Sequence, residues 1–347
     1  MHGLAIDAGD SGRACAQGER PVVSVLMPVR DGGAWLAEAV ASVLAQSWRA
    51  LELLVVDDHS SDGAVDALSR HDPRLRILAS PARGIVAALN HGLAAARGPW
   101  IARMDADDVC APERLATQLA WAAAHALDIV AACVEAIDTA ADSGLRRYID
   151  WSNGLTAPAD IARELFVESP LVHPTVLMRA DLLRRLGGWR DGDFPEDYEL
   201  WLRAAQAGCR FGKPPAVLLQ WRDHGRRLTR TDQRYAADRF LRLKAAHLAR
   251  WRLGGRPVWI GGAGPGGRAL HDALRREGVE VTGFVDVHPR RIGGAKRGLP
   301  VWPYARLAEP LDAIGLIAVG NPGAHARVRA DMAPWGLREG VDWLFVL

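Results

Sequence analysis

Cysteine is scarce in this chain of 347 residues, and the few copies are not spaced like metal or disulfide motifs. No two of them form a CxxC pair, so the sequence signals neither a structural zinc site nor a disulfide framework. We therefore expect a reducing, cytoplasmic environment. The cysteines are Cys15, Cys110, Cys133 and Cys209.

A large excess of charge of either sign is also missing. Lys+Arg total 43 and Asp+Glu total 41, which gives a formal net charge of +2. So small an excess does not predict a nucleic-acid-binding protein. Hydrophobic residues make up 49% of the chain and charged residues 24%. This is the composition of an ordinary globular protein, and it excludes wholesale disorder and collagen-like repeats.

Long apolar runs are absent as well. A membrane-spanning helix needs about 18 consecutive apolar residues. The nearest candidate, 115–134, is interrupted by Thr117, Gln118 and Asp128, and we expect it to form a helix followed by a strand. Residues 1–20 lack the basic and apolar regions of a signal peptide, and we expect them to be a disordered tail.

What the sequence does contain is an alternation of strands and helices. A length of 347 residues predicts about two domains. After the tail, apolar runs alternate with amphipathic stretches, which is the pattern of a parallel α/β sheet. We expect strands over 22–28, 51–56, 75–78 and 100–104, and helices over 34–45, between 63 and 75, and over 85–96.

A second α/β pattern begins after an arginine-rich amphipathic helix, which is expected over 235–253. From Pro257 the chain predicts a strand, a glycine-rich turn and a helix, then further strands over 280–285 and 314–319. We therefore predict four parts in chain order. They are a disordered tail (1–20), an α/β domain (21–234), a linker helix (235–255) and a smaller Rossmann-like βαβ domain (256–347).

Acidic side chains follow the strands of the first domain where each strand ends, which is the edge where open α/β sheets bind ligands. Asp105 and Asp107 come directly after a strand and leave the sheet edge on the same side. A single aspartate there is a common turn residue. Two adjacent carboxylates repel each other unless a cation lies between them. Oxygen ligands of this kind suit Mg²⁺ or Mn²⁺.

An ordered series of motifs over residues 21–235 resembles the bacterial family 2 glycosyltransferases. These are inverting enzymes of the GT-A fold that use nucleotide-sugar donors. The aspartate pair is one of the motifs, and the others occur around it in the order of the family. They are Ser24–Val29, Ser42–Ser47, Glu52–Asp62, Leu89–Gly98, His173–Thr175 and Glu196–Arg203.

The resemblance implies a nucleotide site for a UDP-sugar donor, formed by the first motifs. Asp58, with Asp57, would accept hydrogen bonds from uracil or ribose. Pro28 and Arg30 stand in the segment that contacts the base and ribose, and Asn90 matches the asparagine of a later motif.

Two positions depart from the family pattern. Arg30-Asp31 replaces a common Tyr-Asn pair, which puts the base and ribose contacts in doubt. Leu89 replaces an arginine that precedes the asparagine in many members, so a phosphate contact would have to come from elsewhere, from Arg83 or Arg103.

The resemblance also implies the catalytic groups. Asp105 and Asp107 would hold Mn²⁺ or Mg²⁺ on the donor diphosphate, with Asp107 the direct ligand. Asp197, beside Glu196, would be the general base for the acceptor hydroxyl. The residues by themselves allow another interpretation, in which Glu196-Asp197 caps the following helix. His224 would complete the metal site or contact the diphosphate, and the alternative is a surface histidine in a loop.

The second domain carries the motif Gly262-x-Gly264-x-x-Gly267 between a strand and a helix, and Asp286 ends the next strand. This pattern suits a phosphate at a helix N-terminus and a carboxylate on ribose. It resembles the nucleotide-sugar-binding domain of sugar acyltransferases. The alternative is a Rossmann-like domain kept for packing or regulation.

These observations predict a metal-dependent hexosyltransferase that transfers a sugar to a saccharide or lipid-linked acceptor in surface polysaccharide synthesis. The alternative is a nicotinamide- or nucleotide-binding oxidoreductase or sensor acting through the second domain. We expect a cytoplasmic protein with no nucleic-acid partner. The arginines of helix 235–253 leave open a peripheral contact with anionic lipid at the inner membrane face.

Overall fold

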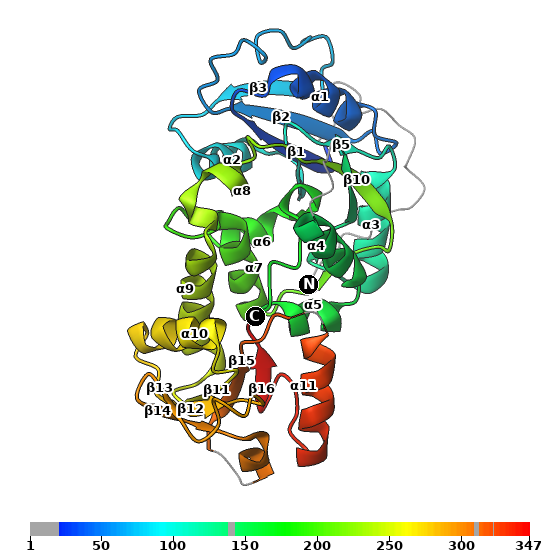
Figure 1. The fold of residues 1–347 in the computed structure, drawn as a ribbon. Helices are drawn as coiled ribbons and strands as arrows, with labels where there is room; N and C mark the ends of the chain where they lie inside the picture. The colour runs from blue at the N-terminus through cyan, green and yellow to red at the C-terminus, as the bar shows by residue number, and fades with distance from the viewer. Residues whose placement is uncertain (1–20, 138–142, 309–311, 322) are drawn as a thin grey trace. The chain divides into compact units, whose positions relative to one another are not determined.

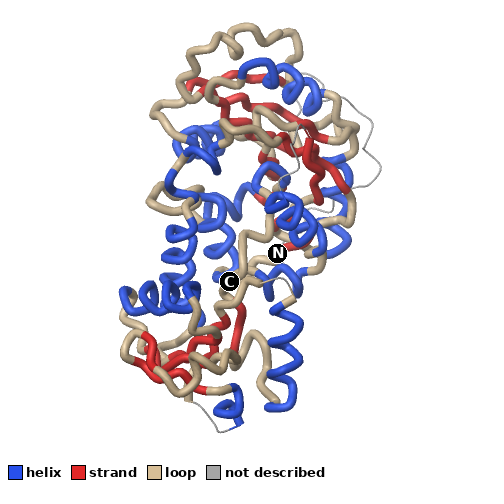
Figure 2. Tube along the Cα trace, in the orientation of Figure 1, coloured by secondary structure: helices blue, strands red, loops and turns tan. Residues whose placement is uncertain are grey.

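The computed structural model describes residues 21–137, 143–308, 312–321 and 323–347 (Figure 1). The tail expected over 1–20 lies outside these residues. The chain divides into two compact units. The first contains the chain up to Ile161 with Pro170–Asp191 and Glu196–Thr231. The second contains Ala162–Ser169, Gly192–Pro195 and Asp232–Leu347. Helices and strands alternate in both units (Figure 2).

The centre of the first unit is a parallel group of strands. β1 (Val23–Val29) pairs in parallel with β2 (Leu51–Asp57) on one side and β4 (Trp100–Arg103) on the other. β3 (Leu75–Ala79) pairs in parallel with β2. Because the strands are parallel, the carboxyl ends of β1, β2 and β4 meet at one edge of the sheet. The α/β class predicted from the sequence is confirmed.

The other half of the sheet, beyond the strands predicted from the sequence, is not parallel throughout. β8 (Leu177–Arg179) runs antiparallel to β4 and to β6 (Ile129–Val130), and β9 (Phe211–Gly212) lies beyond β6. These strands have two or three residues each. Strands this short show no hydrophobic periodicity in the sequence, so they could not be predicted from it.

The helices α1 (Leu36–Leu44) and α2 (Ile85–Ala95) agree with the sequence prediction. The helix predicted between 63 and 75 is wrong, because this segment forms turns. Only Val65 and Leu68 are buried there, and Pro73 prevents a longer helix. Two buried apolar residues span only about one helical turn, and an amphipathic helix needs more of them to form a buried face.

A small second sheet in the first unit brings distant segments to the end of β4. β10 (Val217–Arg222) pairs antiparallel with β5 (Val109–Cys110) and parallel with β7 (Cys133–Ile137). The remaining helices of this unit include α7, which carries the predicted base. They are α3 (Arg114–His125), α4 (Ser143–Gly154), α6 (Ala180–Arg185), α7 (Glu196–Gln206) and α8 (Leu228–Thr231), with a 3₁₀ turn, η2, at His173–Thr175. α5 (Pro158–Glu164) runs from the first unit into the second.

The second unit has its own sheet, in the order β13-β14-β12-β11-β15-β16. Its core strands are parallel, as expected for a Rossmann-like βαβ pattern. The strands are β11 (Val258–Gly261), β12 (Val281–Val285), β13 (Ala295–Lys296), β14 (Leu299–Trp302), β15 (Ile314–Ile317) and β16 (Trp343–Phe345). The helices are α9 (Ala237–His247), which continues as a π-helical turn over Leu248–Arg252, α10 (Pro265–Arg276) and α11 (Ala324–Met332). Across the described part of the chain, no helix combines the length and apolar character needed to span a membrane.

Candidate active site

Three carboxylates converge where β4 ends. Asp105, Asp107 and Asp108 each place one oxygen within 4.8 Å of the oxygens of the other two. Asp105 and Asp107 are half-buried, and Asp108 is buried. The sequence prediction named only the first two as ligands. The signal for the third was the unbroken run Asp107-Asp108, which follows directly on the expected motif.

The electrostatics of this cluster favour a bound cation. Burial raises the pKa of Asp105, and the charge of Asp107 adds to that effect while Arg103 opposes it. Burial, followed by the charges of Asp105 and Asp107, raises the pKa of Asp108 well above its ordinary value. Carboxylates in this position are held ionised most readily by a divalent cation between them.

Each aspartate also has a partner in the first unit, and the partners of Asp107 and Asp108 come from the distant segment around the end of β10. Asp105 forms an ion pair with Arg103, which is buried at the end of β4. The ring nitrogen Nε2 of His224 lies 2.8 Å from Oδ2 of Asp107. The backbone N–H of Arg222 donates to Oδ1 of Asp108 at 2.9 Å. The other oxygen of Asp108, Oδ2, is buried without a hydrogen-bond partner among the described residues. An orphaned carboxylate oxygen beside two further carboxylates fits a hard divalent cation.

The loop after β10 adds a stacked basic cluster beside these acids. The ring of His224 packs on Trp35, with ring centroids 4.4 Å apart. The guanidinium carbons of Arg226 and Arg222 lie 5.1 and 5.5 Å from the same indole ring. The sequence prediction missed Trp35 and Arg226, because neither belongs to a motif. Cations next to the carboxylates would suit a diphosphate leaving group.

The predicted nucleotide residues lie at the ends of β1 and β2. Asp58 is buried and accepts a hydrogen bond from the N–H of Gly84 at 2.8 Å. Asp57 is half-buried and accepts from the N–H of Ser60 at 2.9 Å. Pro28 is half-buried in β1, and Arg30 just beyond it is exposed. The structure therefore brings these four residues to one edge of the sheet.

Asp31, one of the departures from the family pattern, has a structural partner. Its Oδ1 accepts a hydrogen bond from the backbone N–H of Ser61 at 2.7 Å, and its own N–H donates to Ser60 Oγ at 3.0 Å. The hydrogen bond from the Ser61 backbone lowers the pKa of Asp31. This carboxylate joins the loops after β1 and β2.

Asn90 on α2 is bonded to the backbone of Trp189. Its amide nitrogen donates to the Trp189 carbonyl at 2.8 Å, and its amide oxygen accepts from the Trp189 N–H at 3.0 Å. A Cβ on Gly188 would lie 2.3 Å from that amide oxygen, so only glycine allows this approach. The structure thus connects Asn90 with the segment before α7.

Glu196 and Asp197 are the first two residues of α7. Glu196 is buried, and Oδ1 of Asp197 accepts a hydrogen bond from the N–H of Tyr198 at 2.7 Å. Burial, followed by the charge of Glu196, raises the pKa of Asp197 to about 7, although Arg103 opposes the shift. A carboxylate with this pKa is a better proton acceptor at neutral pH than an ordinary aspartate.

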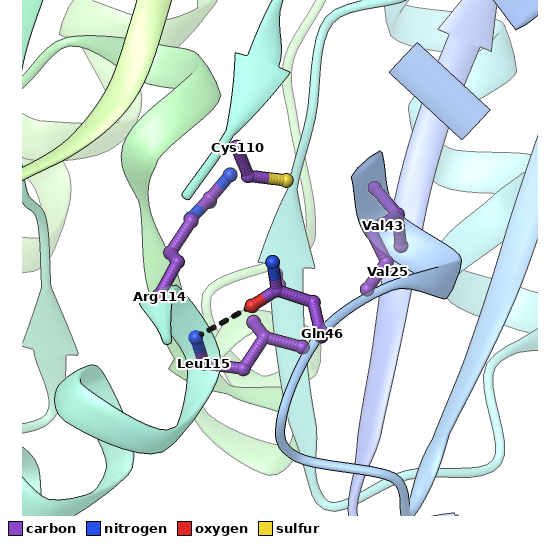
Figure 3. A pocket seen from close by; sticks show the side chains of 7 residues that line it. Val25, Val43, Gln46, Cys110, Arg114 and Leu115 are labelled. Atoms are coloured by element: carbon purple, nitrogen blue, oxygen red, sulfur yellow. Dashed lines mark hydrogen bonds between the residues drawn. The ribbon is translucent and has the colours of Figure 1, made fainter. Parts of the chain in front are cut away.

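Behind the carboxylates, a buried polar contact holds the chain that follows them. Figure 3 shows Gln46 facing the start of α3, where its oxygen accepts from the N–H of Leu115 at 3.0 Å. Its amide nitrogen donates to the Ala111 carbonyl at 2.6 Å. Arg114, from the same small pocket, donates to the Arg103 carbonyl at 2.7 Å. These contacts support the site from behind.

In the second unit, the glycine motif is a close-packed turn. A Cβ on Gly267 would lie 1.8 Å from the carbonyl oxygen of Gly262, so α10 can approach β11 only through glycine. Gly264 precedes α10. Asp286 accepts hydrogen bonds from the backbone of Ala263 and from Arg291, at 2.8 and 3.0 Å. Nucleotide binding by these residues stays a prediction.

Comparisons with known proteins identify the family of the chain. A model of the family "Glycosyl transferase family 2" matches residues 24–187. The relative "Putative glycosyltransferase EpsE" of Bacillus subtilis (strain 168) is 30% identical over 227 residues, which are 63% of this chain and 79% of EpsE. The "Amylovoran biosynthesis glycosyltransferase AmsE" of Erwinia amylovora is 29% identical over 192 residues, covering 54% of this chain and 70% of AmsE.

A solved structure shows the same fold. TarS 1-349 of S. aureus, crystallised in complex with UDP-GlcNAc, gives a TM-score of 0.55 at 18% identity. The likeness covers 74% of this chain and 72% of that one. The family match ends at residue 187, so the resemblance of the second unit to sugar acyltransferases stays a prediction. For the first unit the predicted family is confirmed, and the chain belongs to glycosyltransferase family 2 as a glycosyltransferase with a GT-A-like fold.

Proposed function

We propose that this enzyme is an inverting, metal-dependent transferase of a hexose from a UDP-sugar to an acceptor hydroxyl in surface polysaccharide synthesis. The observation that carries the proposal is the cluster of Asp105, Asp107 and Asp108 with its orphaned buried oxygen. The pathway follows the printed name of AmsE, a glycosyltransferase of amylovoran biosynthesis. An enzyme of polysaccharide synthesis would act on a saccharide or a lipid-linked acceptor, and this is the acceptor class we propose.

The three aspartates would hold the cation, and His224 would complete the metal site through its contact with Asp107. A bound Mn²⁺ or Mg²⁺ supplies Lewis-acid stabilisation of the charge that develops on the leaving nucleoside diphosphate. Arg226 and Arg222, held against Trp35, place further positive charge beside the same carboxylates.

Asp197 carries out the proton transfer in this proposal. The acceptor oxygen attacks the anomeric carbon of the sugar as the bond from that carbon to the diphosphate breaks, and the hydroxyl proton passes to the Asp197 carboxylate. Arg103 acts electrostatically on both Asp105 and Asp197, which supports a single site for the two carboxylates. In-line attack from the face opposite the diphosphate inverts the anomeric centre.

The test is a donor screen with the full chain. UDP-hexoses are incubated with Mn²⁺ or Mg²⁺, UDP release is followed, and acceptor products are identified by mass spectrometry. Release of UDP with at least one sugar, and its loss in EDTA, is the expected result. Binding of NAD without any turnover of a nucleotide sugar would favour an oxidoreductase or sensor instead.

A further inference from the structure

Trp189 connects two motifs that lie far apart in the sequence. Its backbone is paired with the side chain of Asn90, and its indole Nε1–H donates to Nε2 of His173 at 3.1 Å. Trp189 is 3% exposed and His173 7% exposed, so water does not compete for this hydrogen bond. All three residues belong to the first unit.

This hydrogen bond determines the tautomer of His173. An indole N–H can only donate, so Nε2 of His173 must be the acceptor and must carry no proton. Burial, followed by the charge of Arg103, lowers the pKa of His173 well below its usual value, which keeps the ring neutral. In a neutral imidazole the single proton then resides on Nδ1.

The Nδ1–H of His173 lies on the side of Glu196. Nδ1 lies 4.0 Å from Oε1 of Glu196, which is 1% exposed. Trp201 packs edge-on against the imidazole, with ring centroids 5.8 Å apart, and restricts its rotation. A movement of about 1 Å would convert the 4.0 Å separation into a hydrogen bond. Such contacts often tighten when substrate binds.

We propose that Trp189 and His173 are positioning residues that fix the orientation and charge of Glu196, and through it the basicity of Asp197. The inference rests on the proposed function, because it gives Asp197 the role of base. The Nδ1–H of His173 keeps Glu196 ionised, and the Glu196 charge keeps the Asp197 carboxylate basic. Asn90 acts from α2 by holding the Trp189 backbone.

The charged groups that face this pair come from two neighbouring elements. Glu196 itself lies beside Asp197 on α7, and Arg103 acts on Asp197, on His173 and on Glu196 from the end of β4. Trp189→Phe replaces none of these charged side chains. It removes only the indole donor, so any change in the pH profile reports on the tautomer of His173.

The first experiment needs no substrate. Long-range ¹H–¹⁵N spectra of histidine-labelled full-length protein report the tautomer of each ring, and His173→Gln assigns the signal. The wild type is expected to show the Nδ1–H form, and Trp189→Phe a mixture of the two tautomers. Trp121→Phe is the matched control, since Trp121 lies 4.2 Å from the ring of His125 on α3, outside the site. An Nε2–H signal for His173 in the wild type would overturn the proposal, whatever the donor screen gives.

The second experiment measures UDP release against pH. Trp189→Phe is expected to lower kcat about 10-fold, leave KM for the donor unchanged, and move the acid limb to lower pH as Glu196 loses its charge. His173→Asn, whose amide nitrogen mimics Nδ1, is expected to retain more activity than His173→Gln, which mimics Nε2. If the acid limb of the pH profile does not move, and activity falls only in proportion to the folded fraction, Trp189 and His173 have a purely structural role and the proposal is overturned. If the wild type releases UDP from none of the donors, the proposed function is refuted, but the spectroscopic result on the His173 tautomer still stands.

Discussion

The imidazole of His224 lies 2.8 Å from the carboxylate of Asp107, although 117 positions separate them in the chain. The ring is also stacked on Trp35, and its Nδ1 accepts the backbone N–H of Arg226 at 3.2 Å. These contacts hold the loop after β10 against the three aspartates at the end of β4. Segments of the first unit that lie far apart in the sequence therefore build one site.

The first prediction is metal dependence of UDP release. EDTA should abolish the activity and Mn²⁺ or Mg²⁺ should restore it, because the clustered carboxylates need a cation to stabilise a leaving diphosphate. His224→Ala should raise the metal concentration for half-maximal activity about 10–100-fold, as loss of a partner of a metal ligand does. His125→Ala, an exposed histidine on α3, is the control and should behave as wild type. Full activity in EDTA contradicts the assignment.

The second prediction concerns Asp197→Asn, which keeps the shape of the side chain and removes its capacity to accept a proton. We expect kcat to fall by about 10²–10⁴, the usual contribution of a general base. Donor affinity should stay within a small factor, because other residues are proposed to hold the nucleotide. The measurement is turnover and thermal unfolding on the same sample. A lowered melting temperature with unchanged kcat would favour the helix-capping interpretation.

The third prediction is the pH dependence of the wild type. Burial and Glu196 raise the pKa of Asp197 to about 7. The base is then half ionised near pH 7, and the rate should fall about tenfold for each pH unit below that value. This limb should be absent from the residual activity of Asp197→Asn.

The same pKa shift predicts a stability effect with a definite sign. The folded-state pKa of Asp197 lies above the ordinary value of 3.8, so ionisation of this group favours the unfolded chain. Its contribution to stability is greatest in acid and is lost as pH rises toward about 7. We therefore expect the free energies of unfolding in urea of wild type and Asp197→Asn to differ less at pH 5 than at pH 8. At pH 8 the variant should be the more stable of the two.

Much of the proposed donor site could be predicted from the sequence, because it depends on long buried strands. β1, β2 and β4 have readable apolar runs, and each ends in a polar motif. Asp105 and Asp107 follow β4 directly, so their convergence needed only the topology of a parallel sheet. Asp108 was not predicted as a partner, because its role depends on the backbone of Arg222 from a distant strand.

The surroundings of Glu196 and Asp197 were less predictable, because their contacts join segments with no local signal. His173 and Trp189 are joined by one hydrogen bond between a turn and a loop. Neither residue type predicts such a contact from the sequence. The short segment Ala162–Ser169 likewise belongs to the second unit, where Glu164 pairs with Arg329 at 2.9 Å. Sequence periodicity cannot show that a stretch of eight residues packs with a later part of the chain.

The last prediction tests what holds α7, and with it Asp197, in place. Arg203 forms a buried ion pair with Glu199 one turn earlier, 2.6 Å apart, and also donates to the Gly188 carbonyl at 2.9 Å. Arg203→Met would leave the Glu199 carboxylate buried and without this partner, which costs about 3–5 kcal/mol of unfolding free energy. The matched control is Arg185→Met.

Arg185 forms an i,i+4 pair with Asp181 of the same spacing and a distance of 2.6 Å, but those side chains are 65% and 63% exposed, against 10% and 4% for Arg203 and Glu199. An exposed pair contributes about 0–1 kcal/mol, so this control should barely change the urea midpoint. Equal small losses in both variants would mean that Arg203 does not anchor the helix. A large loss for Arg203→Met alone, with kcat reduced in the folded protein, would mean that the ion pair orients α7 and the catalytic carboxylates at its first turn.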